Sequence, residues 1–282
     1  MDCTSPIYIN GDTFPCGKCL NCRARSRQEW VFRLRMEYAA CDFGLFVTLT
    51  YNDETLPPDG VSVRDCQLFL KRLRKHYKSN TLRYYLCSEY GDHTERWHYH
   101  ALLFFKGLDR KDMKNIYDTI EAAWSNGFCY FGDIEEGSIV YVTKYCLKGS
   151  FVPPGKNDNF RILSKMNGGI GANYIELNKD YHLPKLDKPR LVHYQGKTAP
   201  MPRYYRNKLM QQLGDDLEDV KIMYQISVKE ARDKREKDIR SDFNYKYPNL
   251  ATDDHAYIMW RHGRQDRKEE LYLKHTKKQN VM

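Results

Sequence analysis

The sequence contains no long hydrophobic run. No apolar stretch approaches the roughly 18 residues that a membrane-spanning helix requires, and residues 1–6 do not begin an apolar leader. We therefore expect no membrane association, and a reducing compartment in which cysteines stay as thiols. The phosphate-binding pattern Gly-x-x-x-x-Gly-Lys-Ser/Thr is also absent, which excludes a P-loop helicase domain within this sequence.

The composition is that of a folded, basic and tyrosine-rich protein. Of 282 residues, 41% are hydrophobic and 29% are charged, which predicts a packed core with a charged surface. Lys and Arg outnumber Asp and Glu by 46 to 37, so the formal net charge is +9. This basic excess favours polyanionic partners, nucleic acid first, and the 22 tyrosines offer aromatic faces on which single-stranded bases can stack.

Hydrophobic periodicity predicts an α+β fold in which helices pack on a central antiparallel sheet. The expected strands are residues 44–51, 82–90, 97–105 and 128–134, and the expected helices are residues 23–41, 62–77, 109–125 and 137–148. From residue 44 onward, the order is β-α-β-β-α-β-α. The second and third strands are separated by a loop short enough to make them a hairpin.

The periodicity weakens after residue 150. Residues 151–200 are expected to be mainly loops, because glycine and proline interrupt them, for example at Gly168–Gly171. A long charged helix is expected around residues 206–240. The basic and polar residues 261–282 are expected to be partly disordered.

Two histidines flank one tyrosine at the start of the third expected strand. Side chains alternate along a strand, so His98 and His100 point the same way, about 7 Å apart, and can bind one divalent cation. The hairpin turn would bring Glu89 back to a similar height. A carboxylate with two imidazoles suits Mg²⁺ or Mn²⁺, although Zn²⁺ also accepts such ligands. The alternative is half-exposed histidines at a strand edge and an exposed carboxylate in a turn.

The helix expected at residues 137–148 carries two pairs of functional side chains. Tyr141 and Tyr145 share one helical face, and Lys144 and Lys148 form a second pair at the same spacing. A tyrosine can attack phosphorus and form a covalent phosphotyrosine. Its phenol, with an ordinary pKa of about 10, would need a metal-polarised phosphate and a lysine that steadies negative charge. The alternative is an amphipathic helix whose tyrosines pack on the sheet.

The N-terminal segment holds a cluster of cysteines: Cys3, Cys16, Cys19 and Cys22. Four thiols are enough for a tetrahedral structural Zn²⁺, and the overlapping C-x-x-C-x-x-C spacing also occurs in iron–sulfur ligation. Free thiols in a reducing cell are the alternative. The other cysteines fall within expected elements and are interpreted as small buried side chains: Cys41, Cys66, Cys87, Cys129 and Cys146.

Three motifs resemble those of HUH endonucleases, the family that includes rolling-circle replication initiators. Phe46–Tyr51 resembles the first motif of that family, which lies on the first strand of the sheet. His98 and His100 resemble its histidine–hydrophobe–histidine motif. Tyr141–Lys148 resembles its nucleophile helix, in the two-tyrosine form found in initiators of small single-stranded DNA bacteriophages.

Two further segments are similar to the replication initiators of gokushovirus-type microviruses. They are Phe14–Arg23, with Trp30 downstream, and Gly169–Tyr174. The resemblance covers residues 3–180 and implies an RRM-like HUH nuclease fold. It also implies a division of the chain into a cysteine-rich segment with a basic helix at 1–41, an HUH endonuclease domain at 42–180, and a charged, mainly helical extension at 181–282.

The resemblance implies a role for each candidate residue. The implied ligands of a catalytic Mg²⁺ or Mn²⁺ are His98, His100 and Glu89. The implied nucleophiles are Tyr141 and Tyr145, and the basic residues around the scissile phosphate are Lys144 and Lys148.

The implied reaction is a transesterification on single-stranded origin DNA in the cytoplasm of an infected bacterium. One tyrosine would attack a phosphodiester, keep the 5′ phosphate and release a 3′ hydroxyl for a host polymerase, with a host helicase as a further partner. The second tyrosine would cut the regenerated origin, and strand transfer would close the circle without ATP. Two alternatives stay open: a non-catalytic single-stranded nucleic-acid-binding module, and a transposase or relaxase with the same chemistry.

Overall fold

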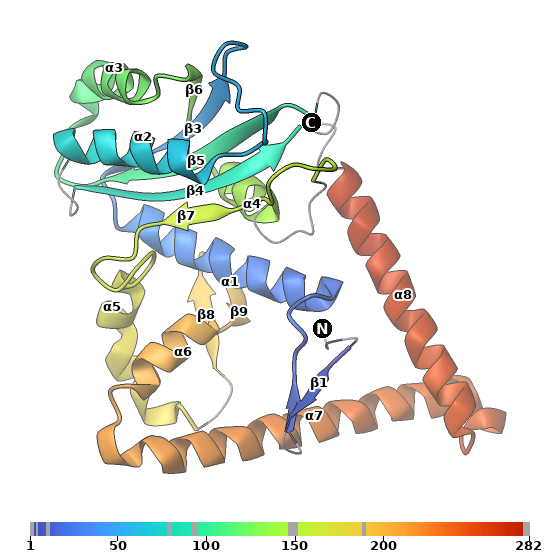
Figure 1. Ribbon diagram of the computed structural model, residues 1–282. Helices are drawn as coiled ribbons and strands as arrows, with labels where there is room; N and C mark the ends of the chain where they lie inside the picture. Colours follow the sequence, from blue (N-terminus) through green and yellow to red (C-terminus); the bar gives the residue numbers. More distant parts are fainter. Residues whose placement is uncertain are drawn as a thin grey trace. The chain divides into compact units, whose positions relative to one another are not determined.

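The computed structural model describes residues 3, 5–9, 12–77, 81–91, 95–145, 152–187 and 190–278 (Figure 1). The chain divides into two compact units. The first unit comprises Met1–Tyr181 and Met201–Leu209, and the second comprises His182–Pro200 and Met210–Met282. The histidine motif, the tyrosine helix and the N-terminal cysteines therefore all belong to the first unit.

A five-stranded antiparallel sheet forms the centre of the first unit. Its strands follow in the order β6 (Gly127–Asp133), β3 (Phe43–Tyr51), β5 (Trp97–Phe105), β4 (Leu82–Tyr90) and β7 (Arg161–Leu163). Every neighbouring pair runs antiparallel, and β4 and β5 are joined as a hairpin. The expected α+β fold, with helices packed on a central antiparallel sheet, is confirmed.

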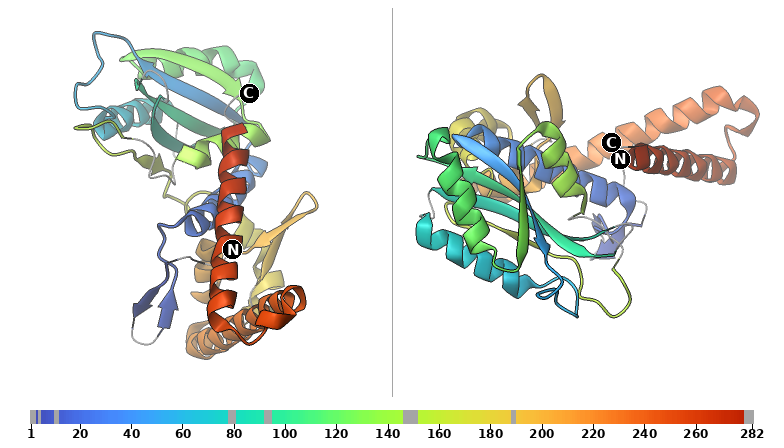
Figure 2. Two further views of the ribbon diagram at one scale, coloured as in Figure 1. Left: turned by 90° about the vertical axis from the view of Figure 1, so that its right-hand side faces the viewer. Right: turned by 90° about the horizontal axis from the view of Figure 1, so that it is seen from above.

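Helices α2 (Val63–His76) and α3 (Met113–Ala123) cover one face of the sheet (Figure 2). Alternate residues of β3 and β5 point into this core, among them the fully buried Tyr99. Helix α2 begins where expected, because the Ser62 side chain accepts a hydrogen bond from the Asp65 amide at 3.2 Å and caps the first turn. This core supports the strands from the face opposite the histidine pair.

Helices α1 (Leu20–Ala39) and α4 (Glu136–Tyr145) lie on the other face (Figure 1). They correspond to the helices expected at 23–41 and 137–148. Leu34 of α1 and Val142 of α4 are fully buried there with apolar side chains of β4 and β5. The helix that carries the tyrosine pair is therefore placed directly over the face of the sheet to which the histidines point.

A glycine-rich turn packs against α1. The carbonyl of Ile170 accepts two hydrogen bonds from the Arg33 guanidinium, at 3.0 and 2.9 Å, and the Gly171 amide donates to Glu37 at 2.6 Å. Gly171 has φ +72°, and a Cβ there would lie 2.5 Å from the Arg33 carbonyl oxygen, so a side chain does not fit. The Gly169–Tyr174 segment thus serves the packing of α1.

The expectation that residues 151–200 are mainly loops is wrong. β7 completes the central sheet, α5 (Asn173–His182) follows the glycine-rich turn, and β8 (Leu191–Tyr194) pairs with β9 (Lys197–Pro200). Strands of three or four residues are too short to show alternation, and β7 acquires its partner only through the fold. The N-terminal segment likewise contains a hairpin, formed by β1 (Ile7–Ile9) and β2 (Asp12–Phe14).

The C-terminal part of the chain is mainly helical, with α6 (Arg203–Met210), α7 (Leu217–Lys246) and α8 (Asp254–Lys278). The single helix expected around 206–240 is divided between α6 and α7 by a turn at Gly214. The expected disorder from residue 261 is corrected too, because α8 continues through Lys278.

Aromatic packing joins α7 to α8 within the second unit. Phe243 lies 5.4 Å from Tyr257 and 5.3 Å from Trp260, measured between ring centroids, and Arg240 bonds to Asp254 at 2.7 Å. Short 3₁₀ helices occur at Arg110–Asp112, Leu183–Lys185, Gly214–Asp216 and Pro248–Leu250. In the described part of the chain, no helix is both long and apolar enough to cross a membrane.

Candidate active site

Glu89, His98 and His100 converge on the sheet face that α4 covers. The β4–β5 register places Glu89 directly opposite His98, and His100 follows two residues later on the same face. Oε2 of Glu89 lies 3.0 Å from Nε2 of His100 and 3.5 Å from Nε2 of His98. One ligand atom from each residue lies within 4.8 Å of the others, so the three side chains can share one ion.

Neighbouring side chains orient the His100 ring. Its Nδ1 lies 3.0 Å from Oγ1 of Thr48, its partner across on β3, and the ring stacks on Phe46 with centroids 5.4 Å apart. The Thr48 hydroxyl can donate to a bare Nδ1 or accept from an Nδ1–H, so it fits either tautomer. When Nδ1 carries the proton, the lone pair of Nε2 is available on the side of Glu89, as a metal ligand requires.

The protonation states of the buried pair suit a cation. Burial lowers the pKa of His100, so its ring is neutral at neutral pH. Burial by itself would raise the pKa of Glu89, but hydrogen bonds with His100 and His98 outweigh it and lower that pKa to about 2. An ionised carboxylate beside a neutral imidazole is the combination that binds a divalent metal ion.

Tyr141 reaches from α4 to this group of ligands. Its hydroxyl lies 3.4 Å from Oε2 of Glu89, and its ring meets the His100 ring edge-on, with centroids 5.1 Å apart. The side chain still exposes 37% of its surface. A tyrosine oxygen that touches both the ligand set and solvent is within reach of a phosphate that enters from outside.

Contacts with α1 hold α4 in this position. Arg35 forms an ion pair with Glu136 at the first residue of α4, and Arg27 donates to the carbonyl of Val140 at 3.3 Å. Val142 is buried against the sheet, which sets the rotation of the helix and leaves the neighbouring Tyr141 at the margin of the contact. The position of the phenol is therefore determined by packing along most of α4.

The other candidates on α4 are described only in part. Lys144 and Tyr145 belong to the helix, and Tyr145 is its last residue. Their side chains fall outside the described residues, and so does the whole of Lys148. Their expected roles stay predictions.

The cysteines form two groups. The Sγ atoms of Cys3, Cys16, Cys19 and Cys22 all lie within 4.8 Å of one another. Among the others, Cys66 and Cys87 are buried as expected, whereas Cys41 and Cys129 are only half-buried. Cys41 lies in the turn after α1 and Cys129 on the edge strand β6, where neighbours cover one side only. Cys146 falls outside the described residues.

Two exposed aromatic residues extend the site toward the edge of the sheet, and sequence reasoning missed both. Phe128 and Tyr130 of β6 expose 60% and 61% of their surfaces. Each shares a cross-strand row with one histidine: Phe128–Thr50–His98 and Tyr130–Thr48–His100. The alternation of residues 127–133 is the signal that could have found them, because the intervening Cys129 and Phe131 pack toward the core.

Comparison with known proteins places the chain in a family. Residues 44–150 match the family described by replication-associated protein ORF2. Replication-associated protein VP4 of Bdellovibrio phage phiMH2K is 32% identical over 212 residues, which is 69% of this chain and 66% of that protein. The chain belongs to the phage replication-associated proteins. The resemblance to microvirus-type replication initiators is thereby confirmed.

Other phage replication-associated proteins are also similar. ORF2 of Spiroplasma virus 4 is 28% identical over 254 residues, 80% of this chain and 75% of that protein. ORF4 of Chlamydia phage 1 is 23% identical over 225 residues, 72% of this chain and 55% of that protein. Among solved structures, the N-terminal nuclease domain of minute virus of mice non-structural protein-1 matches 66% of this chain and 75% of that chain, at 11% identity. Its TM-score is 0.18, so nothing about this chain follows from that similarity.

Proposed function

We propose that this protein initiates replication by nicking single-stranded origin DNA and later rejoining it. The observation that carries the proposal is the approach of the Tyr141 hydroxyl to Oε2 of Glu89, at 3.4 Å. A tyrosine beside a carboxylate–imidazole ligand set suits metal-assisted attack on a phosphodiester. Membership of the phage replication-associated proteins supports an origin as the target rather than a transposon end or a plasmid transfer site.

The ligand set fits a divalent cation. His98, His100 and Glu89 offer two imidazole nitrogens and one carboxylate oxygen, a set that suits Mg²⁺ or Mn²⁺ and leaves coordination positions for phosphate oxygens. When bound, such an ion supplies Lewis-acid polarisation of the scissile phosphate. Thr48 keeps the His100 ring in the orientation and tautomer that ligation needs.

The Tyr141 oxygen makes the new bond. It attacks phosphorus, the P–O3′ bond breaks, and the freed 3′ oxygen takes a proton from water to become a hydroxyl that a host polymerase extends. The phenol proton leaves to solvent at the exposed side of the ring, because Glu89, with its pKa of about 2, is a weak base. The protein keeps the 5′ phosphate as a phosphotyrosine.

Tyr145 performs the second cleavage in this proposal. It attacks the regenerated origin, and the 3′ hydroxyl that it releases attacks the phosphotyrosine of Tyr141 to close the circle. Each step exchanges one phosphoester for another, so no nucleotide cofactor is needed. Lys144 and Lys148 stabilise the negative charge on the phosphate during both attacks.

Phe128 and Tyr130 bind the single strand beside the cleaved bond. Both rings are exposed, and both lie in the sheet rows that contain the histidines. Aromatic faces on which bases stack are a common means of binding single-stranded DNA without base pairing. The net charge of +9 adds attraction for the phosphate backbone. The setting is the infected bacterial host, with its polymerase and a helicase as partners.

A covalent-adduct assay tests the proposal. The protein is incubated with Mn²⁺ and labelled single-stranded oligonucleotides that tile the genome encoding it, and the products are separated on a denaturing gel. A labelled protein band from one oligonucleotide, with a free 3′ hydroxyl on the other fragment, is the expected result. Binding without any adduct across the whole set would overturn the nicking proposal in favour of a non-catalytic binding module, which the exposed aromatics would serve equally well.

A further inference from the structure

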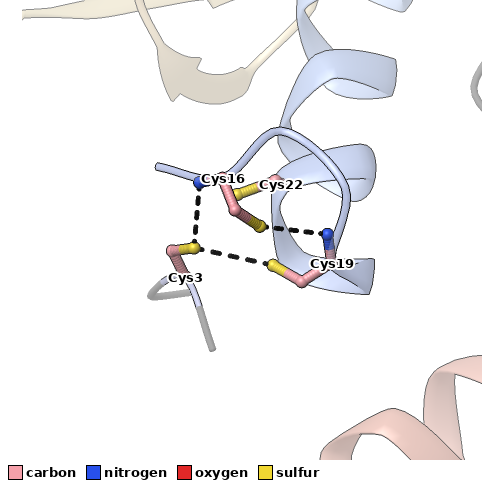
Figure 3. Close-up of side chains that lie close together, drawn as sticks. All are labelled: Cys3, Cys16, Cys19 and Cys22. Carbon is pink, nitrogen blue, oxygen red and sulfur yellow. Dashed lines mark hydrogen bonds between the residues drawn. The ribbon is translucent and has the colours of Figure 1, made fainter. Parts of the chain in front are cut away.

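The N-terminal cysteine cluster is built from elements other than those of the candidate active site. Cys16 and Cys19 lie in the turn before α1, Cys22 lies in the first turn of that helix, and Cys3 precedes the β1–β2 hairpin. Figure 3 shows the four side chains pointing toward one another. Every Sγ lies within 4.8 Å of the others, and those of Cys3 and Cys19 are 3.8 Å apart.

Backbone amides surround these sulfur atoms. The amides of Lys18 and Cys19 donate to Sγ of Cys16 at 3.4 and 3.2 Å, and the amide of Cys16 donates to Sγ of Cys3 at 3.2 Å. Gly17, with φ +73°, turns the chain so that the following amides face the sulfur. Amide donors stabilise a thiolate more than a thiol, because the bond to a charged acceptor is stronger.

The sulfur positions fit a single tetrahedral ion better than the alternatives. Sulfurs bonded to one Zn²⁺ at about 2.3 Å lie about 3.8 Å from each other, the separation that Cys3 and Cys19 show. A disulfide would bring two sulfurs to about 2.05 Å, and all four residues are free cysteines. An iron–sulfur cluster inserts several iron and sulfide ions between the thiolates and needs a wider cage.

We propose that Cys3, Cys16, Cys19 and Cys22 bind one structural Zn²⁺ as four thiolates. Binding releases the thiol protons to solvent and involves no change of oxidation state. Four protein ligands close the coordination sphere, so no position is left for a substrate. All-thiolate ligation also favours zinc over the Mg²⁺ or Mn²⁺ expected at the histidine site.

The ion would anchor the β1–β2 hairpin to the start of α1. Ile7, Tyr8 and Ile9 of β1 expose 47%, 74% and 52% of their surfaces, so this strand buries little apolar area. A two-stranded hairpin with so little packing is marginally stable in water. Because Cys3 and Cys16 lie on either side of the hairpin, a shared ion closes it at its base.

Metal analysis of the purified full-length protein tests the site. We expect one equivalent of zinc in the unmodified protein, in the Cys129→Ser control and in a His98→Ala/His100→Ala variant, and loss of that zinc in Cys16→Ser/Cys19→Ser. Zinc that disappears with the histidines would overturn the assignment. Iron with acid-labile sulfide in place of zinc would also overturn it.

A titration of the unmodified protein avoids dependence on variants that fail to fold. Stepwise addition of an organomercurial thiol reagent, with a chromogenic zinc indicator present, should release the zinc as the first four thiols react. Replacement of zinc by Co²⁺ should give the intense near-ultraviolet sulfur-to-metal absorption of tetrathiolate cobalt. Zinc that stays bound after all thiols are blocked, or cobalt spectra without sulfur bands, would contradict the proposal.

Hydrogen exchange tests the anchoring role. Removal of the zinc should speed amide exchange in residues 7–9 and 12–14 by at least about 10-fold and leave the amides of β5 unchanged. Equal protection of the hairpin with and without zinc would show that the ion does not anchor it. Because the nicking assay is separate, a chain that nicks DNA but holds no zinc would refute this inference alone.

Discussion

The hydroxyl of Tyr141 lies 3.4 Å from Oε2 of Glu89, across 52 positions of sequence. Glu89 in turn lies 3.0 Å from His100 and 3.5 Å from His98, so this one contact joins a helix to the strands that carry the ligands. Each of these residues can be changed without emptying the large apolar core on the opposite face of the sheet. Chemistry and folding can therefore be tested separately.

Removal of the phenol oxygen should stop DNA cleavage. We expect Tyr141→Phe to lower the rate of adduct formation by at least about 1,000-fold, the scale seen when an essential nucleophile is lost, and Tyr141→Phe/Tyr145→Phe to abolish it. Tyr245→Phe is the matched control, because Tyr245 lies on α7 and exposes 88% of its surface. An adduct that persists in the double variant would show that neither tyrosine is the nucleophile.

Loss of a ligand should separate cleavage from binding. We expect His100→Ala and Glu89→Gln each to reduce the Mn²⁺-dependent cleavage rate by about 100-fold or more, because the polarising ion is no longer held. Affinity for single-stranded DNA, measured by fluorescence anisotropy without metal, should change by less than about 3-fold, since stacking and charge are untouched. Cleavage that survives either substitution at saturating Mn²⁺ would remove these residues from the ligand set.

The Thr48 hydroxyl should tune metal affinity. Thr48→Val keeps the shape of the side chain but removes the partner of Nδ1 of His100, which lies 3.0 Å away. We expect the Mn²⁺ concentration for half-maximal cleavage to rise by about 10-fold, in the range found when partners of metal-bound histidines are removed. The rate at saturating Mn²⁺ should recover. Thr119→Val on the exposed side of α3 is the control, and an unchanged Mn²⁺ requirement in Thr48→Val would exclude an orienting role.

The exposed aromatics of β6 should contribute affinity rather than chemistry. Loss of one stacked base costs about 1–3 kcal/mol, so Phe128→Ala and Tyr130→Ala should each weaken binding of single-stranded DNA by at least about 5-fold. The cleavage rate at saturating DNA should stay near that of the unmodified protein. Tyr181→Ala, on α5 with 58% of the side chain exposed, serves as the control. Equal losses for all three variants would refute a specific platform.

Stability of the protein without added Mg²⁺ or Mn²⁺ should fall as the pH is lowered. The pKa of Glu89 is about 2 in the fold against an ordinary 4.5, so the unfolded chain takes up this proton first and stability is lost between those values. The pKa of His100 lies below its ordinary 6.5, so stability is also lost as the pH drops below 6.5. In urea unfolding at stepped pH, Glu89→Gln should flatten the acidic part of the curve. An identical curve for this variant would show that Glu89 is not paired in the folded protein.

Local patterns were sufficient for the strands that hold the ligands. β4 and β5 match the expected residues 82–90 and 97–105 because each is a continuous, largely apolar segment bounded by polar residues. The short connection then leaves few registers, and the observed one sets Glu89 opposite His98. The same argument places Tyr141 on an amphipathic helix, although it does not say where on the sheet that helix packs.

Other elements have no local signal of comparable strength. β7 has three residues and becomes a strand only beside β4. The exposed Phe128 and Tyr130 look like ordinary strand residues until the register shows which face they share with the histidines. The turn at Gly168–Gly171 reads as a loop, because its purpose, the close approach to Arg33 of α1, involves a residue far away in sequence.

The sequence by itself determined the ligand pair, the hairpin that adds Glu89, the tyrosine helix and the cysteine spacing, because periodicity and short-range turns specify which residues share a face. Only the tertiary structure decided that Tyr141 meets Glu89, that aromatics of an edge strand continue the rows of the histidines, and that Cys3 joins the other three cysteines. These relationships join segments tens of residues apart or strands that are not neighbours in sequence. They follow from packing of α4 against α1 and from the order of strands in the sheet, which no local pattern encodes.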